Sequence, residues 1–291
     1  MVSEFEAQVR ATNDKINART GRPFAMAITV GLALGLSLLF SLIFVKELYM
    51  LFAGVLVAFT AFELASALRF AGLNIPRLPT VIAAVAVVPA SFYWAAEGQW
   101  YVTLAGIAFV GLWRLVWLVR PNHRGSVRSV LRDLGAGVFV MLYVAFLASF
   151  TVLLTARDGG QWWTLAMLIV VVVSDIGAYA SGLSFGKHPM APTISPNKTW
   201  EGFAGAAIAS VTAGVLLALF MIDQPVWVGI IFGLVILGTA TMGDLAESLI
   251  KRDLGIKDIS TWLPGHGGFL DRVDSSLLSA AAGYALFLIF T

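Results

Sequence analysis

Residues 226–252 read VWVGIIFGLVILGTATMGDLAESLIKR and join a long apolar segment to a charged end. An α-helix needs about 20 predominantly apolar residues to cross the hydrocarbon core of a membrane. The first part of this segment suits such a helix, yet Asp244 and Glu247 follow in the same run. Charged groups are costly in lipid unless they pair, bind a metal or face water. The stretch therefore predicts a membrane helix that carries a functional site near one end.

The composition of the whole chain agrees with a membrane protein. Of its 291 residues, 59% are hydrophobic and 12% are charged, and the mean hydropathy is +0.86. An ordinary soluble domain has about twice that share of charge. Cysteine is absent, which excludes disulfides, thiol catalysis and cysteine-bound metals. The net charge of +2 is too small to indicate a nucleic-acid partner.

Further apolar stretches recur along the chain with short breaks. We expect an all-α fold, a polytopic membrane helix bundle of about nine transmembrane helices, at 24–45, 48–68, 78–96, 100–119, 134–155, 161–182, 202–221, 226–250 and 276–290. With a cytoplasmic N-terminus, every Lys and Arg except Lys46 and Arg157 falls in or beside a cytoplasmic segment. We therefore divide the chain into a cytoplasmic N-terminal tail at 1–23, scaffold transmembrane helices at 24–155, and catalytic transmembrane helices with cytoplasmic loops at 156–291.

The charged end of span 226–250 has helical spacing. Asp244, Glu247, Ser248, Lys251 and Arg252 follow at i, i+3, i+4, i+7 and i+8, which places them on one helix face. One interpretation is an internally neutralised polar stripe that lines a bundle. The other is a set of carboxylates that hold divalent cations, beside cations that neutralise phosphate.

Span 161–182 supplies a matching carboxylate. Asp175 and Asp244 both lie about 10 Å below the cytoplasmic ends of their helices, at 1.5 Å per residue. Two carboxylates at one depth can share a metal, provided that the two helices are adjacent.

Two cytoplasmic loops carry further polar residues. Ser195, Asn197 and Lys198 precede Thr199, which suits the N-cap of the next helix; a lysine beside a helix N-terminus is either an anion site or an ordinary loop and cap. In the second loop, Gly267 and Gly268 allow a close backbone approach to a ligand.

The residues around the second loop leave alternatives open. Asp271 and Asp274 share a face if the last helix has already begun; otherwise Asp274 or Ser275 caps it. His266 is a candidate ligand, general base or phosphate contact, with the metal-ligand role the least expected because Mg²⁺ prefers oxygen. Carboxylates for magnesium and cations for phosphate are the groups that phosphoryl or nucleotidyl transfer requires, and the membrane setting points to a lipid substrate.

These motifs resemble the signature of the CDP-diacylglycerol synthases (phosphatidate cytidylyltransferases). The resemblance covers residues 174–274 and is carried by SLIKR at 248–252, KD at 257–258, LPGHGGFLDRVD at 263–274, SDIGAY at 174–179, SPNKTWEG at 195–202 and GDLAES at 243–248. It implies a nucleotidyltransferase that uses one or two Mg²⁺ ions to convert CTP and phosphatidate into CDP-diacylglycerol and pyrophosphate. It also implies a multi-pass protein of the cell (inner) membrane with its active site facing the cytoplasm, no nucleic-acid partner and a possible homodimer.

The resemblance assigns roles to particular residues. The implied catalytic residues are Asp175, Lys198, Asp244 and Asp271. The implied metal ligands are Asp175, Asp244, Glu247, Asp271 and Asp274. The implied substrate-binding residues are Ser195, Asn197, Lys251, Arg252, Lys257, His266, Gly267, Gly268 and Arg272.

Two other functions are compatible with part of the pattern. One is a related membrane lipid kinase or a CTP-dependent transferase acting on another lipid. The other is a cation transporter, which the sequence disfavours because the charges of the outer loops have no deep partners in the spans. Glu63 and Arg114, in the scaffold spans, have no assigned role.

Overall fold

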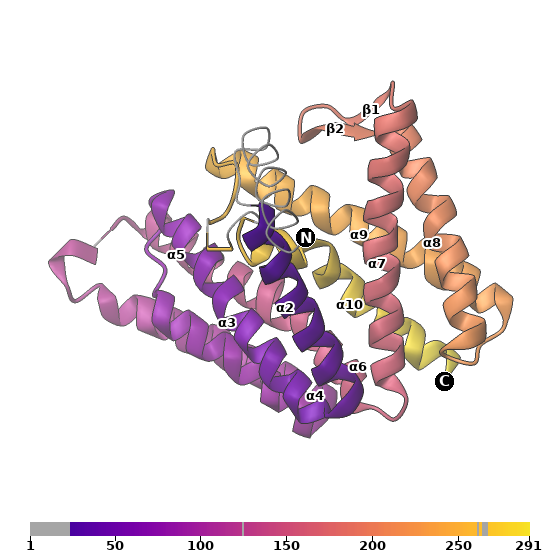
Figure 1. Cartoon of the computed structure of the whole chain (residues 1–291). Helices are drawn as coiled ribbons and strands as arrows, with labels where there is room; N and C mark the ends of the chain where they lie inside the picture. Colours follow the sequence, from indigo (N-terminus) through magenta and orange to yellow (C-terminus); the bar gives the residue numbers. More distant parts are fainter. Residues whose placement is uncertain (1–23, 124, 261, 264–266) are drawn as a thin grey trace, which may run out of the picture.

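The computed structural model of the chain describes residues 24–123, 125–260, 262–263 and 267–291 (Figure 1). It is a bundle of long helices, as predicted. In chain order the helices are α2 Phe24–Phe44, α3 Lys46–Phe70, α4 Arg77–Trp117, α5 Val127–Val140, α6 Leu147–Ala156, α7 Gly160–Phe185, α8 Trp200–Phe220, α9 Val226–Leu254 and α10 Leu270–Phe290. A 3₁₀ turn, η1 Pro121–His123, follows α4, and a π-helical segment, η2 Met141–Phe146, joins α5 to α6. The predicted tail at 1–23 and His266 lie outside the described residues.

The long helix α4 contains the predicted spans 78–96 and 100–119 with no loop between them. Ala95 has non-helical backbone angles, φ 53° and ψ −145°. A Cβ on Gly106 would lie 3.2 Å from the Cβ of Ala83, whereas a straight helix would separate these residues by about 35 Å. The chain therefore doubles back within α4. Within the described ranges, seven helices are long and apolar enough to cross a membrane, with α4 counted once and α5 to α6 counted as one. The number of crossings stays a prediction.

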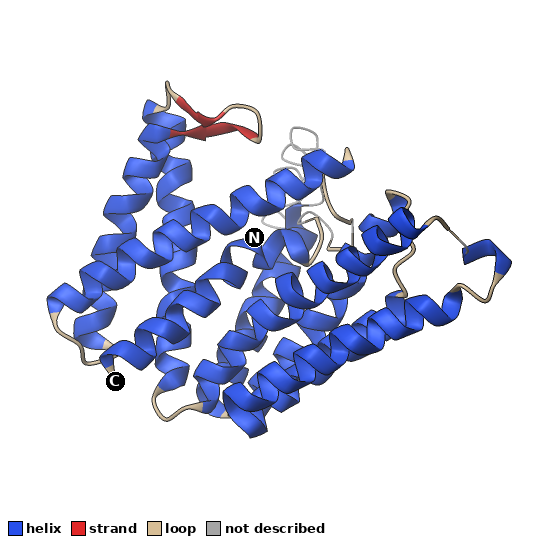
Figure 2. Cartoon of the chain, turned by 180° about the vertical axis from the view of Figure 1, so that it is seen from behind, coloured by secondary structure: helices blue, strands red, loops and turns tan. Residues whose placement is uncertain are grey.

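The two parts of the chain lie side by side in the bundle. In both views α2 to α5 occupy one side, and α7 to α9 occupy the other (Figures 1 and 2). The last helix, α10, packs against α9, α7 and α6, and so lies between the two parts. Any site at the start of α10 is therefore within reach of both. The division into scaffold and catalytic parts remains a prediction about their roles.

Small residues bring the helices of the second part into close contact. A Cβ on Gly177 of α7 would lie 3.0 Å from the carbonyl oxygen of Gly205 in α8. A Cβ on Gly243 of α9 would lie only 2.5 Å from the carbonyl oxygen of Asp274 in α10. Glycine at 243 therefore lets the acidic end of α9 lie directly against the first turns of α10.

Two features differ from the predicted spans and loops. The loop expected between 186 and 199 contains an antiparallel strand pair, β1 Pro189–Ala191 and β2 Ser195–Thr199. The last helix begins at Leu270, before the apolar span predicted at 276–290, as in the alternative in which it has already begun at Asp271. Its first turns contain charged residues, and a prediction that counts apolar residues leaves them out. They are helical because their charges have partners or face a cavity.

Arg114, on the returning arm of α4, has a partner in α5. Its Nε and Nη2 donate to Oδ2 of Asp133 at 2.9 and 2.7 Å, and the backbone N–H of Asn74 donates to Oδ1 at 2.9 Å. Both charged side chains are at most 3% exposed. Since the pair is neutral as a unit, burial of Arg114 in the scaffold follows from Asp133.

Candidate active site

The strand β2 places Lys198 against the acidic face of α9. The Nζ of Lys198 lies 2.5 Å from Oδ2 of Asp244, and Oγ of Ser248 donates to the other oxygen of Asp244 at 3.4 Å. The next residue along the strand, Thr199, caps α8 as predicted, because its Oγ1 accepts from the N–H of Gly202 at 3.1 Å. Strand pairing before Lys198 and the helix cap after it hold the lysine in place.

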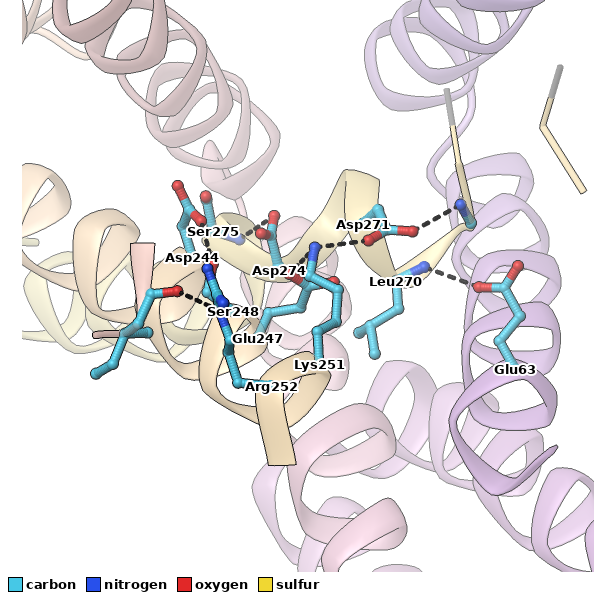
Figure 3. Close-up of polar contacts among 12 residues, drawn as sticks. Glu63, Asp244, Glu247, Ser248, Lys251, Arg252, Leu270, Asp271, Asp274 and Ser275 are labelled. Atoms are coloured by element: carbon cyan, nitrogen blue, oxygen red, sulfur yellow. Dashed lines mark hydrogen bonds and ion pairs between the residues drawn. The ribbon is translucent and has the colours of Figure 1, made fainter. Parts of the chain in front are cut away.

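A second lysine joins α9 to α10. The Nζ of Lys251 lies 2.6 Å from Oε2 of Glu247 on the same helix and 2.9 Å from Oδ1 of Asp271 on α10 (Figure 3). The side chains of Glu247 and Asp271 are 1% and 6% exposed, and that of Lys251 is 21% exposed. One partly accessible cation thus neutralises two buried carboxylates. The prediction that the charges of α9 share one face is consistent with the pairing of Glu247 and Lys251.

The first turns of α10 carry the other two carboxylates. The backbone N–H of Gly268 donates to Oδ2 of Asp271 at 2.7 Å, and that of Ser275 donates to Oδ1 of Asp274 at 2.7 Å (Figure 3). Because α10 begins at Leu270, Asp271 and Asp274 lie inside the helix. The alternative in which Asp274 or Ser275 caps this helix is therefore wrong.

Two cavities share Asp175 in their walls. The smaller, of about 320 Å³, is lined by residues of α7, α8, α9 and the strand pair, among them Asp175, Asn197, Lys198 and Asp244. The larger, of about 510 Å³, is lined by Asp175, by Asp271, Arg272 and Asp274 of α10, and by apolar side chains of α2, α3, α6 and α7. Asp175 and Asp244 both line the smaller cavity, and α7 contacts α9. The two helices are therefore adjacent, which was the condition for their carboxylates to share a metal. The carboxylate of Asp175 is therefore common to a cavity that Lys198 and Asp244 line and to a cavity that the apolar side chains of α2 and α3 line.

The other predicted site residues are spread around these cavities. Arg252 is exposed, and its Nε donates to the carbonyl of Ile194, between the two strands, at 3.1 Å. Lys257 is exposed beyond the end of α9, and Ser195 lies on β2. Gly267 adopts a φ of +80°, in the left-handed region that favours glycine, and its carbonyl accepts from the N–H of Leu263 at 2.9 Å.

The carboxylates of the site supply the type of ligand atom that a magnesium ion prefers, although lysines contact several of them. Asp175, Asp244 and Asp274 act on one another as like charges, and all their ligand atoms are oxygens, which Mg²⁺ prefers. One oxygen of Glu247, Oε1, is buried without a hydrogen-bond partner in the described part of the chain. In that same part, no group of three or more His, Cys, Asp or Glu side chains is arranged to hold a metal. Lys198 and Lys251 contact oxygens of Asp244, Glu247 and Asp271. Magnesium binding stays a prediction.

Two carboxylates to which the sequence assigned no role have several hydrogen-bond partners in the structure. Glu63 of α3, 2% exposed, accepts from Oγ of Ser260 and from the N–H of Leu270. Glu201 accepts from the N–H groups of Lys187 and His188, and its Oε1 lies 2.5 Å from Nδ1 of His188. The position of Glu63 in an apolar span was a signal in the sequence. Its partners could not be predicted, because they lie about 200 residues later in the chain.

The fold and the site together define a class of protein, a polytopic membrane protein whose paired carboxylates and lysines gather around two adjoining cavities. A family model described as "Cytidylyltransferase family" matches residues 25–290. The chain therefore belongs to the cytidylyltransferase family and is a nucleotidyltransferase enzyme.

Several relatives named phosphatidate cytidylyltransferase match most of the chain. That of Mycobacterium bovis is 40% identical over 276 residues, which cover 92% of this chain and 89% of the relative. That of Mycobacterium leprae is 38% identical over 280 residues, which cover 94% of this chain and 90% of the relative. That of Staphylococcus epidermidis is 31% identical over 230 residues, which cover 78% and 84%.

Proposed function

We propose that this protein transfers the cytidylyl group of CTP to phosphatidate, giving CDP-diacylglycerol and pyrophosphate. The observation that carries the proposal is the position of Asp175, which lines both a smaller cavity with Lys198 and Asp244 in its wall and a larger cavity lined by many apolar side chains. A nucleotide and a lipid headgroup need such a junction. The names of the relatives support the same reaction.

The reaction is limited by charge repulsion and not by the strength of a base. The phosphate of phosphatidate is already anionic near neutral pH, and one of its oxygens attacks the α-phosphorus of CTP while pyrophosphate leaves. Both reactants are anions, so cations that neutralise them lower the barrier. Lys198, Lys251, Arg252 and Lys257 supply that charge. His266 then serves to bind or orient the substrate, since the reaction needs no obligatory base.

The triphosphate competes with carboxylates for these lysines. Lys198 is paired with Asp244 at the smaller cavity, so a phosphate bound there shares or takes over the lysine. Carboxylates among Asp175, Asp244, Glu247, Asp271 and Asp274 would hold one or two Mg²⁺ ions, which would neutralise charge on the triphosphate and on pyrophosphate.

The larger cavity suits the acyl chains of the lipid. Leu38 of α2, Phe52 and Leu56 of α3, and Leu168 of α7 line it together with the carboxylates of α10. A lipid in this cavity has its tails among apolar side chains and its phosphate beside Asp175 and Asp274.

The protein is a multi-pass membrane protein. We place it in the cell (inner) membrane with the site facing the cytoplasm, on the basis of the Lys and Arg distribution. A homodimer is a further prediction, which the mass of the purified protein in detergent tests.

The proposal is tested with purified protein, labelled CTP, Mg²⁺ and phosphatidate in detergent. We expect a lipid-soluble cytidine product with phosphatidate, none with diacylglycerol, and a loss of at least about 100-fold in turnover for Asp244→Asn. Transfer of the γ-phosphorus of CTP to diacylglycerol, with release of CDP and no cytidine in the lipid, would indicate a lipid kinase. Full turnover by Asp244→Asn would overturn the role of the α9 carboxylates.

A further inference from the structure

One face of α3 holds the segment that leads into α10. Phe59 stacks on Phe269, with ring centroids 4.7 Å apart and planes 9° apart. Trp262 stacks on Phe62 at 5.4 Å and meets Phe59 edge-on at 5.6 Å. Phe59 and Phe62 thus contact Trp262 and Phe269 through their rings. Glu63, on the same face of α3, contacts the backbone at Leu270.

Glu63 caps α10 from a different helix. The N–H of Leu270, the first residue of α10, donates to Oε2 of Glu63 at 3.0 Å (Figure 3). Oγ of Ser260 donates to Oε1 of Glu63. The first N–H groups of a helix have no partner within it, and a negative charge there is favoured by the helix dipole. At 2% exposure, Glu63 is shielded from water, which strengthens both effects.

The capped residue is adjacent to Asp271. Asp271 accepts from the N–H of Gly268 through one oxygen and contacts Lys251 through the other. A Cβ on Gly268 would lie 2.9 Å from Oε2 of Glu63 and 3.1 Å from Oδ2 of Asp271. The two carboxylates thus converge on one glycine. A shift of the backbone at Leu270 would move Asp271 and, through it, Lys251.

We propose that Glu63 is a positioning residue for the active site. By accepting from the N–H of Leu270, Glu63 fixes the position at which α10 begins. That position determines where Asp271 and Asp274 lie relative to α9. The inference rests on the proposed function, in which these two carboxylates serve the transfer reaction. It gives the scaffold part of the chain a direct role in the geometry of the site.

Two substitutions separate positioning from charge. Gln at 63 keeps an acceptor for the N–H of Leu270, and its amide can donate to Oγ of Ser260, whereas Leu keeps neither bond. For Glu63→Leu we expect kcat to fall about 10- to 100-fold, the KM for CTP to change less than about threefold, and the Mg²⁺ concentration for half-maximal rate to rise. Glu63→Gln should retain kcat within about fivefold of the wild type, because the cap geometry survives.

Hydrogen exchange provides a readout independent of activity. Backbone amides of residues 268–274 should exchange faster in Glu63→Leu and at the wild-type rate in Glu63→Gln. A matched control is Gln99→Leu, which removes hydrogen bonds from buried Gln99 to Ser149 and Phe146 elsewhere in the scaffold. The control should lower the thermal midpoint while leaving exchange at 268–274 and kcat per folded enzyme unchanged.

Three results would overturn the proposal: wild-type kcat in Glu63→Leu, lost activity with wild-type exchange at 268–274, or the same pattern in Gln99→Leu. If the wild-type protein itself forms no CDP-diacylglycerol, the proposed function fails. The exchange comparison still decides whether Glu63 positions α10.

Discussion

Two lysines hold the carboxylates of the site in place, Lys198 against Asp244 and Lys251 between Glu247 and Asp271. Helical spacing predicted that Glu247 and Lys251 lie on one face, and their pairing fits this, because residues four apart are neighbours on a helix. It could not predict Asp271, which reaches Lys251 only after a chain reversal. The identity of the charged residues was thus readable from the sequence, whereas the partners that neutralise them were not.

The bridging role of Lys251 predicts a large loss of stability on its removal. Lys251→Gln leaves two buried carboxylates without their cation, so we expect destabilisation by about 3 kcal/mol, measured by thermal unfolding in detergent, together with loss of turnover. The double variant Lys251→Gln with Glu247→Gln should regain part of the stability but not the turnover. Lys46→Gln is the control, because Lys46 is half-buried and, among the described residues, donates to the carbonyl of Arg157 and pairs with no carboxylate. Equal midpoints for Lys251→Gln and Lys46→Gln would contradict the bridge.

At the scale of the elements, the contact between α9 and α10 determines the geometry of the site. The apolar spans were predicted well because hydropathy records what lipid requires of a helix. The start of α10 and the strand pair were missed, since both depend on contacts between distant segments. The first turns of α10 are polar, and Lys251 and Glu63 are what stabilise them there.

Two glycines of α9 test this contact as a matched pair. A Cβ at Gly243 would lie 2.5 Å from the carbonyl of Asp274, whereas a Cβ at Gly238 would meet no atom within 4 Å. Gly243→Ala should therefore cost about 1 to 3 kcal/mol and reduce turnover, because two backbones must move apart. Gly238→Ala should keep both properties, since it fills open space and favours the helix. A Gly243→Ala protein with the midpoint and turnover of Gly238→Ala would show that the two helices need not touch.

At the scale of the whole molecule, the first part of the chain contacts the start of α10. Two charges of that part had no assigned role in the sequence. Arg114 pairs with Asp133 within the first part, whereas Glu63 reaches the start of α10. The sequence alone could not show that Arg114 pairs within the first part of the chain while Glu63 reaches α10, since both are single charges in apolar spans.

The orientation in the membrane can be tested by labelling, because the chain has no native cysteine. Thr193→Cys lies exposed between β1 and β2, on the predicted cytoplasmic side, and Asp158→Cys lies exposed between α6 and α7, on the opposite side. A membrane-impermeant maleimide should label Asp158→Cys in intact cells and Thr193→Cys only after the membrane is permeabilised. Labelling of Thr193→Cys in intact cells would reverse the orientation.

In the proposed reaction, the group transferred to the lipid is the cytidylyl group. The most direct measurement follows two preparations of CTP, labelled at the α- or the γ-phosphorus, during a single incubation with phosphatidate and Mg²⁺. The account predicts that the α-label enters the lipid in step with pyrophosphate release and that the γ-label appears in pyrophosphate alone. A γ-label in the lipid would contradict it, because the protein would then transfer a phosphoryl group.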